Sequence, residues 1–330
     1  MHFPAVLPVT IMTLALTLPM VATSNVTDTC SSRRHLSSVI FQVLESIRLQ
    51  DPDILPLATI YKATENSHPS SPAMMTAWRT ITEVEAPAML AIDTVQNSVY
   101  FISAISEGSR SRSILRGRIQ VVDWLITELE LFINRSRGDD GFAFSVEELY
   151  ANYQTLMSLP AGQKKANRET LEALGKALWN PSDNFTATVS DNCQFTEVGW
   201  KVVDTGTYGN GSTNPLGCSW DSTRPYDPDA RANLVIDEEL GFVVSSGMVQ
   251  GKVYPYYGNI STFIPDSMHT QQDAQEVWIN TVKGQGSVSL LSPTEATGEN
   301  MEVVQYYNDE LQALQLNVFL TGPNMTSAWL

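Results

Sequence analysis

The first residues that could do chemistry form an acidic run in the second half of the sequence. Asp237, Glu238 and Glu239 are consecutive and precede Gly241. In a strand, alternate side chains share a face, so Asp237 and Glu239 would point one way and Glu238 the other. A carboxyl group buried in an apolar pocket has a raised pKa and can move a proton near neutral pH. Asp237 and Glu239 are therefore candidate catalytic residues; the plainer interpretation is a solvated acidic turn.

A second candidate pair follows about thirty residues later. Asp266 and His269 are three residues apart and are suited to the roles of a base and the group that orients it. A surface turn is the alternative for this pair. In the first half, Asp123 beside Trp124 is a weaker candidate of the same kind.

Other catalytic signatures are missing from the sequence. It contains no Gly-x-Ser-x-Gly, no glycine-rich phosphate loop and no His-Glu-x-x-His. Beyond the first residues there are only three histidines, and no two have the spacing of metal ligands. We expect no metal site and no cofactor.

The N-terminus is typical of a secretory signal peptide. Residues 1–23 contain no Lys, Arg, Asp or Glu, and prolines interrupt their apolar run, which ends in small residues at Ala22 to Ser24. The alternative is a retained membrane anchor, which would need about 20 unbroken apolar residues. No later stretch is apolar enough to span a bilayer, so we expect a chain that is secreted or held in the secretory lumen.

The sequons and cysteines agree with that compartment. The cysteines are Cys30, Cys193 and Cys218; the last two are predicted to form a disulfide, which leaves Cys30 free or bound to another chain. The Asn-x-Ser/Thr sites predict N-linked glycans at Asn25, Asn134, Asn184, Asn210, Asn259 and Asn324.

Charge limits the partners. The formal net charge is −16, and nucleic acids and anionic membranes both need a basic surface, so we expect neither as a partner. The charge is that of a self-repelling soluble surface. The sequence does not indicate an oligomeric state.

Two amphipathic helices are expected to begin the two halves. Leu36, Val39, Ile40, Val43, Leu44 and Ile47 recur at helical spacing, with Ser31 or Ser32 as cap and an end at Asp51-Pro52. A second helix is predicted after Asn167, with Leu171, Leu174 and Leu178 on its apolar face. Arg33 and Arg168 each stand three residues before the first leucine, which indicates a weak internal repeat.

Period-two patterns follow each helix. In the first half we expect a strand over 98–105 and a turn leading into a strand over 117–124. In the second half the candidate strands are 199–203, 232–236, 241–245 and about 305–320. Helices followed by runs of strands indicate an α+β fold.

The boundary between the halves is placed near residue 160. A short helical stretch, 147–159, ends at Pro160, and a loop rich in Gly, Pro, Asn, Ser and Asp spans 206–230. The expected organisation is a signal peptide (1–23), a first domain (24–160) and a second domain (161–330) with a disulfide-stapled loop and an extended tail.

Three stretches resemble a known family. They are Thr29–Leu36, Asn233–Gly241 and Ile264–His269. In this order they are similar to secreted fungal proteins of undefined function built from two SnoaL-like, ketosteroid-isomerase-like halves. The resemblance covers most of residues 29 to about 270. The sequence departs from it in two ways: Cys30 lacks the cysteine that the family pairs with it, and Met268 separates Ser267 from His269.

The resemblance implies two tandem, cone-shaped curved antiparallel sheets, each packed on helices, as in SnoaL-like and nuclear-transport-factor-like proteins. Such folds hold apolar small molecules and include isomerases, polyketide cyclases and epoxide hydrolases. The expected function is acid–base proton transfer on a polyketide or terpenoid intermediate of fungal secondary metabolism. The alternatives are a non-catalytic secreted ligand-binding or host-interaction protein, or a paralogue that has lost its activity. The second half, with its stapled loop, is expected to hold the pocket.

Overall fold

The computed structural model describes residues 31–108, 112–135, 144–183, 185–203, 215–220, 224–255, 261–284 and 292–330, without the side chains of 255 and 261. The predicted signal peptide, Cys30 and the sequons at Asn25, Asn184, Asn210 and Asn259 lie outside these residues.

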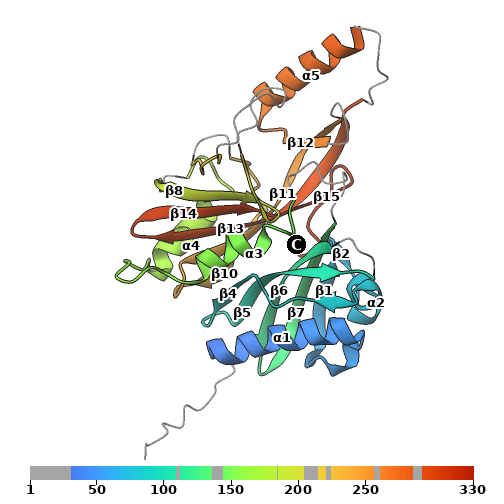
Figure 1. The fold of residues 1–330 in the computed structure, drawn as a ribbon, viewed down its shortest axis with the longest axis vertical. Coiled ribbons are helices and arrows are strands. Elements are labelled where there is room, and N and C mark those ends of the chain that lie inside the picture. Colours follow the sequence, from blue (N-terminus) through green and yellow to red (C-terminus); the bar gives the residue numbers. More distant parts are fainter. Residues whose placement is uncertain are drawn as a thin grey trace, which may run out of the picture.

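The first half is a curved seven-stranded sheet with helices on one face (Figure 1). Its strand order is β2-β1-β7-β6-β5-β3, and β4 also pairs with β5. Its elements are α1 (Arg33–Leu49), η1 (Pro52–Ile54), β1 (Leu57–Glu65), β2 (His68–Pro69), η2 (Pro72–Met74), α2 (Thr76–Thr80), β3 (Glu83–Val84), β4 (Met89–Asp93), β5 (Ser98–Ser106), β6 (Arg112–Val122) and β7 (Leu125–Arg135).

The second half repeats this plan with an eight-stranded sheet. Its strand order is β10-β11-β13-β14-β8-β9, with β12 paired to β11 and β15 paired to β13. After α3 (Leu149–Gln154) and η3 (Thr155–Met157), its elements are α4 (Arg168–Ala177), β8 (Thr188–Glu197), β9 (Trp200–Lys201), β10 (Arg231–Asp237), β11 (Phe242–Pro255), β12 (Ser261–Pro265), α5 (His269–Gly284), β13 (Thr294–Tyr307), β14 (Glu310–Leu316) and β15 (Val318–Thr321).

Both predicted long helices are confirmed, with their caps. The Ser32 side chain accepts a hydrogen bond from the His35 N–H at the start of α1. The Asn167 side chain accepts one from the Thr170 N–H at the start of α4. Each cap satisfies one of the N–H groups that a helix start leaves without a partner.

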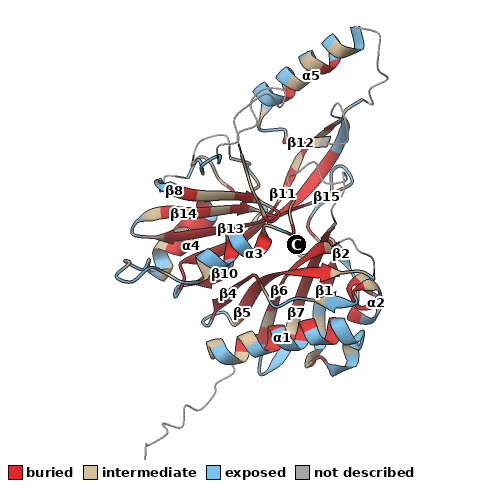
Figure 2. Cartoon of the chain, in the orientation of Figure 1, coloured by how far each residue is buried: buried red, intermediate tan, exposed pale blue. Residues whose placement is uncertain are grey.

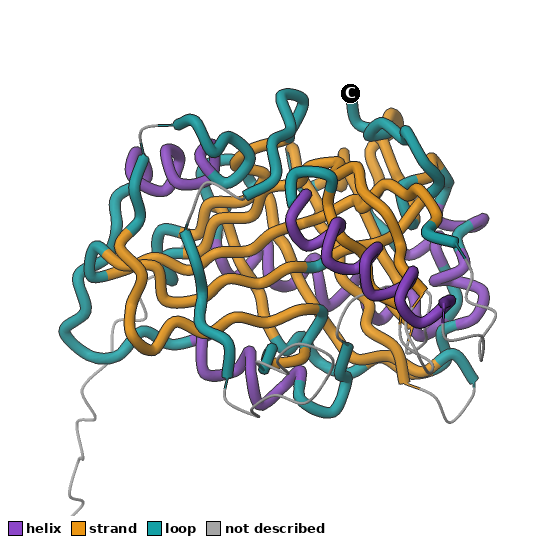
Figure 3. Tube along the Cα trace, turned by 90° about the horizontal axis from the view of Figure 1, so that it is seen from above, coloured by secondary structure: helices purple, strands orange, loops and turns teal. Residues whose placement is uncertain are grey.

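The two sheets pack on each other through the faces that α1 and α4 do not cover. On the first sheet, Phe101 and Leu115 pack under α1, whereas Tyr100 and Phe132 point the other way. There they share a core with residues of the second sheet, among them Phe242, Val244 and Met301. The strands of both sheets are largely buried (Figure 2), and seen from above they overlie and cross one another (Figure 3).

The α+β class is confirmed, but the sheets are mixed, not purely antiparallel as predicted. β1 runs parallel to β7, and β8 runs parallel to β14. In each half, β1 or β8 thus pairs with a strand from much later in that half. Such a pairing depends on tertiary contacts and has no local turn signal.

The predicted turn at Gly117 is wrong. Gly117 lies inside β6, and the turn comes at Asp123 and Trp124, where φ is +48° and +70°. A Cβ at Gly117 would lie 2.5 Å from the Glu130 carbonyl oxygen, so the glycine is needed for close approach of β6 to β7.

The other predicted elements are found with altered bounds. The strand expected over 98–105 is β5, and 232–236 lies within β10. The strand begun at 241 runs on as β11 to Pro255, and the segment 305–320 divides among β13, β14 and β15. Among the described residues, no helix has the length and apolar character to cross a membrane.

Candidate functional site

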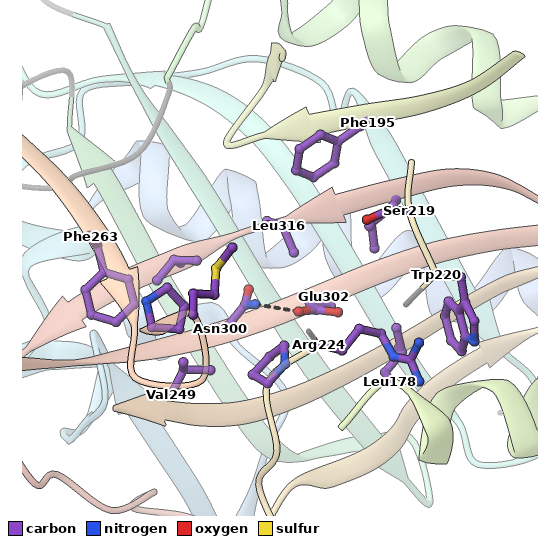
Figure 4. Close-up of a pocket in the computed structure, with 15 residues that line it drawn as sticks. Leu178, Phe195, Ser219, Trp220, Arg224, Val249, Phe263, Asn300, Glu302 and Leu316 are labelled. Atoms are coloured by element: carbon purple, nitrogen blue, oxygen red, sulfur yellow. Dashed lines mark hydrogen bonds between the residues drawn. The ribbon is translucent and has the colours of Figure 1, made fainter. Parts of the chain in front are cut away.

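A cavity of about 190 Å³ opens on the α4 side of the second sheet (Figure 4). Its walls come from the end of α4, from β8, β11, β12, β13 and β14, and from the segment around Trp220. Four of its lining residues are polar: Ser219, Arg224, Asn300 and Glu302. The others are Leu178, Phe195, Trp220, Pro225, Val249, Phe263, Pro265, Met268, Leu314, Leu316 and Val318. The lining is that of a site for an apolar small molecule that bears one polar group.

Among the described residues that line this cavity, Glu302 is the acidic one. It lies on β13 in the register of Val304 and Tyr306, which pack toward α4, and only 5 % of its surface is exposed. Burial raises the pKa of Glu302 to about 8, and the nearby Arg224 and Asn300 oppose this rise. A carboxyl group with that pKa is mostly protonated at neutral pH and can give or take a proton there.

Asn300 holds the Glu302 carboxyl in place. The Asn300 Nδ2 donates to Glu302 Oε1 at 2.8 Å, and the Asn300 Oδ1 accepts from the Asn317 N–H at 3.2 Å. Because the main-chain donor fixes which end of the amide is the oxygen, the amide nitrogen must face Glu302. One carboxyl oxygen is thus held by the protein, and no hydrogen bond to a described residue holds the other.

The disulfide-stapled segment forms one wall of the cavity. The Cys193–Cys218 disulfide predicted from the sequence is present, and Trp220 follows two residues later. The Trp220 ring packs edge-on against Phe185, and its Nε1 donates to the Phe185 carbonyl oxygen at 3.4 Å. The Arg224 guanidinium lies 4.1 Å from the centre of the Trp220 ring. Arg224 thereby brings a positive charge near Glu302.

The structure places Asp237 outside the cavity and in contact with Arg33. Its buried carboxylate accepts two hydrogen bonds of 2.8 Å from Arg33 and further bonds from the main-chain N–H groups of Ile92, Glu239 and Leu240. Both carboxylate oxygens are already occupied by these donors, so neither is left for a substrate. Glu239 is exposed, 3.5 Å from Arg33. The acidic run is the β10–β11 turn.

Asp93 in the first half repeats this arrangement. Its carboxylate pairs with Arg168 at 2.7 Å and accepts hydrogen bonds from the N–H groups of Val95, Gln96 and Ile236. In each half, the arginine at the start of α1 or α4 thus forms an ion pair with an aspartate at a strand end of the other half. The repeat of Arg33 and Arg168 in the sequence therefore marks the two ends of a reciprocal connection.

Asp266 and His269 are not brought together. Both are exposed, and Asp266 Oδ1 accepts a hydrogen bond from Gln272 at 3.0 Å. His269 begins α5. The segment 264–269 contributes to the cavity through the apolar residues Pro265 and Met268. Asp123, the weaker candidate, is exposed at the β6–β7 turn.

Two of the predicted glycosylation sites can be placed. Asn324 is exposed in a turn with φ +57°. Asn134 is only 1 % exposed, accepts a hydrogen bond from Arg116 and donates one to the Val318 carbonyl oxygen. The burial of Asn134 between the two sheets leaves little room for a glycan in the folded chain, and glycosylation there stays a prediction. No group of three or more His, Cys, Asp or Glu side chains arranged for a metal ion occurs among the residues described.

Comparisons find resemblance only at the level of part of the fold. No family model matches the chain, and no curated protein matches it. Among solved structures, a de novo designed protein with a curved β-sheet covers 31% of this chain and 88% of its own, at 14% identity and a TM-score of 0.27. A candidate hydroxylase from Streptomyces galilaeus covers 32% and 82%, at 11% identity and a TM-score of 0.27. A candidate ketosteroid isomerase from Kribbella flavida covers 31% and 78%, at 13% identity and a TM-score of 0.26. Likeness at this level says nothing about activity.

Sequence reasoning missed Glu302, Asn300 and Arg224. The sequence did contain a signal for Glu302 and Asn300. Every second residue along 296–306 faces the α4 side, where Ala296, Val304 and Tyr306 belong to the core. Asn300 and Glu302 are polar residues in that same register. A polar residue on a core-facing register is costly unless it has a partner or a function.

Proposed function

We propose that the chain binds an apolar small molecule in the cavity of its second half and exchanges a proton with it through Glu302. The observation that carries the proposal is the buried Glu302 carboxyl, whose pKa is raised to about 8, in a cavity lined mostly by apolar side chains. Neither Asp237 nor His269 has a part in this proposal.

The chemistry that fits is a net isomerisation or cyclisation without a cofactor. Glu302 in its resting, protonated state donates to an oxygen of the substrate, such as a carbonyl or epoxide oxygen. The carboxylate that forms then takes a proton from another position of the substrate, so that the acid is regenerated and no proton is gained or lost. Arg224 and Asn300 stabilise the carboxylate while it exists, because both lower the pKa of Glu302.

We propose further that the chain acts outside the cytosol, on a polyketide or terpenoid intermediate. A polyketide or terpenoid intermediate has the apolar body and oxygen function that this cavity could hold, and the Cys193–Cys218 disulfide suits a secreted or lumenal glycoprotein. Intact-mass measurement of the protein from culture medium, before and after deglycosylation, tests the setting. An unmodified protein found only in the cytosol would contradict it.

The decisive experiment replaces Glu302 without changing its shape. Metabolites are profiled by mass spectrometry in the source organism with the gene deleted and then restored as wild type, Glu302→Gln or Glu295→Gln. Glu295 is the matched control because it is an exposed acid on the same strand. We expect wild type and Glu295→Gln to restore one product, and Glu302→Gln to lower its formation at least ~100-fold.

The same variants separate catalysis from binding. If deletion leaves the profile unchanged while the purified chain still extracts a small apolar molecule from the source organism, the chain is a ligand-binding protein. A Glu302→Gln variant that restores the product at the wild-type rate would overturn the proton-transfer role.

A further inference from the structure

Between the two sheets lies a second polar group, separate from the cavity and unused by the proposed chemistry. Ile114, Arg116 and Arg118 alternate along β6, so Arg116 and Arg118 point at the second sheet. Arg116 is completely buried. Its Nε donates to Asn134 Oδ1 at 3.0 Å, and its guanidinium lies 4.2 Å from the centre of the Phe132 ring.

The two terminal nitrogens of Arg116 have no acceptor among the described residues. Within the described part of the chain, neither Nη1 nor Nη2 has a hydrogen-bond partner, although both atoms are buried. A guanidinium stays charged inside a protein, and burying its N–H donors without acceptors is strongly unfavourable. The Tyr100 hydroxyl, on the neighbouring strand β5, is also buried and without a partner in the same part of the chain. Tyr100 and Arg116 are close enough for each to shift the pKa of the other.

The nearby carboxylates are engaged by other cations. Glu130 pairs with Arg231 at 2.6 Å and with Arg118 at 3.5 Å. Glu299 accepts a hydrogen bond from the Ser67 hydroxyl through Oε2, whereas its Oε1 lies 3.7 Å from Arg231 and has no hydrogen bond within the described residues. Burial and the nearby Glu130 also raise the pKa of Glu299, which favours its uncharged form. Within the described residues neither Nη1 nor Nη2 of Arg116 has a hydrogen bond to a carboxylate. Burial lowers the pKa of Arg116, and the charges of Glu299 and Glu130 raise it from nearby.

We propose that Arg116 and Tyr100 bind a small monovalent anion, of the size of chloride, between the two sheets. An anion accepts hydrogen bonds without having to donate any, so it satisfies Nη1, Nη2 and the Tyr100 hydroxyl together and balances the charge of Arg116. The anion must be small because Arg116 and Tyr100 have no exposed surface through which a larger ligand could reach them. Bound there, it stabilises the contact between the halves.

The first test uses anion identity at constant ionic strength. Thermal unfolding of the full chain is followed as sodium gluconate, whose anion is too large, is replaced by sodium chloride or bromide. We expect a saturable rise in Tm of about 3 °C or more. Tyr100→Phe should weaken the apparent affinity about tenfold, and Arg116→Gln should abolish the response. Arg112→Gln is the control: it removes the same charge from the same strand, at a partly exposed position paired with Glu85.

The second test does not depend on whether Arg116→Gln folds. In crystals of the wild-type chain grown with bromide, an anomalous peak at hydrogen-bond distance from Arg116 Nη1 or Nη2 supports the site. Ordered water alone at that position overturns the proposal. So does a peak that appears without any effect of anion identity on Tm, since that is an adventitious ion only. A Tm response that persists in Arg116→Gln overturns it as well.

Discussion

Two buried carboxyl groups of the second half show how surroundings decide what an acidic side chain can do. Asp237 is surrounded by donors, two from Arg33 and three from the main chain. Glu302 has one amide donor and an apolar cavity in front of it. The first arrangement ties the two halves together through Arg33 and the Ile92 N–H, and the second keeps a proton available on Glu302.

The raised pKa of Glu302 predicts a pH dependence of stability. Between its ordinary value of 4.5 and about 8, the folded chain keeps a proton that the unfolded chain has released. The free energy of unfolding therefore falls as pH rises through this window, by at most about 1.4 kcal/mol per pH unit from this group. Glu302→Gln should remove that fall. The measurement is urea unfolding of both proteins from pH 5 to 8.

Glu295→Gln provides the comparison, because it removes an exposed acid from the same strand and should keep the wild-type pH dependence. Parallel curves for wild type and Glu302→Gln would show that the Glu302 carboxyl is not protonated in the folded chain. That result would also remove the basis for its role as an acid.

The site could be predicted from the sequence only in part, for a reason that particular residues make clear. The run Asp237-Glu238-Glu239 stands out because its charges are adjacent, yet Asp237 is a structural residue. Glu302 is isolated in the sequence and gains its character from Phe195, Leu314 and other residues that only the folded sheet brings around it. Burial in a curved sheet depends on register and curvature, which local patterns do not specify.

At the scale of elements, the segment that begins at Cys218 and carries Ser219 and Trp220 determines how well the cavity is closed. The Cys193–Cys218 bridge ties the segment that carries Trp220 to β8, which also carries Phe195. Cys193→Ser with Cys218→Ser should lower the free energy of unfolding by about 3 kcal/mol, since the loop spans 25 residues. It should also weaken binding of an apolar fluorescent probe in the cavity, because Trp220 and Arg224 lose their fixed position.

Cys30→Ser is the control for this pair, since it removes a thiol and leaves the bridge intact. Probe binding and unfolding are measured for all three proteins. Unchanged probe affinity in the double variant would mean that the Phe185–Trp220 contact holds this wall without the disulfide.

The elements that the sequence predicts well are those with local signals. α1 and α4 each have a cap and an apolar face. Alternate residues of β5 pack toward α1 and toward the second sheet. The strands β1 and β8, which run parallel to their late partners, and the long strand β13 were missed or cut short. Their partners are far away in the sequence, so pairing across the fold defines them and their composition does not.

At the scale of the whole molecule, the two halves are joined by a reciprocal pair of ion pairs above an apolar core. Arg33 of the first half reaches Asp237 of the second, and Arg168 of the second reaches Asp93 of the first. Each aspartate also accepts a main-chain hydrogen bond across the junction: Asp237 from the Ile92 N–H, and Asp93 from the Ile236 N–H. The two halves therefore hold each other through equivalent residues, as two copies of one subunit do in a symmetric dimer.

This connection predicts that Arg33→Ala and Arg168→Ala are both strongly destabilising. Each leaves a buried aspartate without its cation, which costs about 3–5 kcal/mol. Arg48→Ala is the control, because Arg48 pairs with Glu45 on the exposed face of α1 and should change little. Urea unfolding of the three variants and of the double variant Arg33→Ala/Arg168→Ala measures the effects.

The double variant tests whether the two halves unfold together. If the two ion pairs stabilise one shared junction, losing either pair already weakens that junction. The losses of unfolding free energy in Arg33→Ala and in Arg168→Ala should then add up to more than the loss in the double variant. The double variant should then show separate transitions for the two halves when tryptophan fluorescence and far-ultraviolet circular dichroism are compared. Strictly additive effects with a single coincident transition would mean that the core around Phe132, Phe242 and Met301 holds the halves together without either pair.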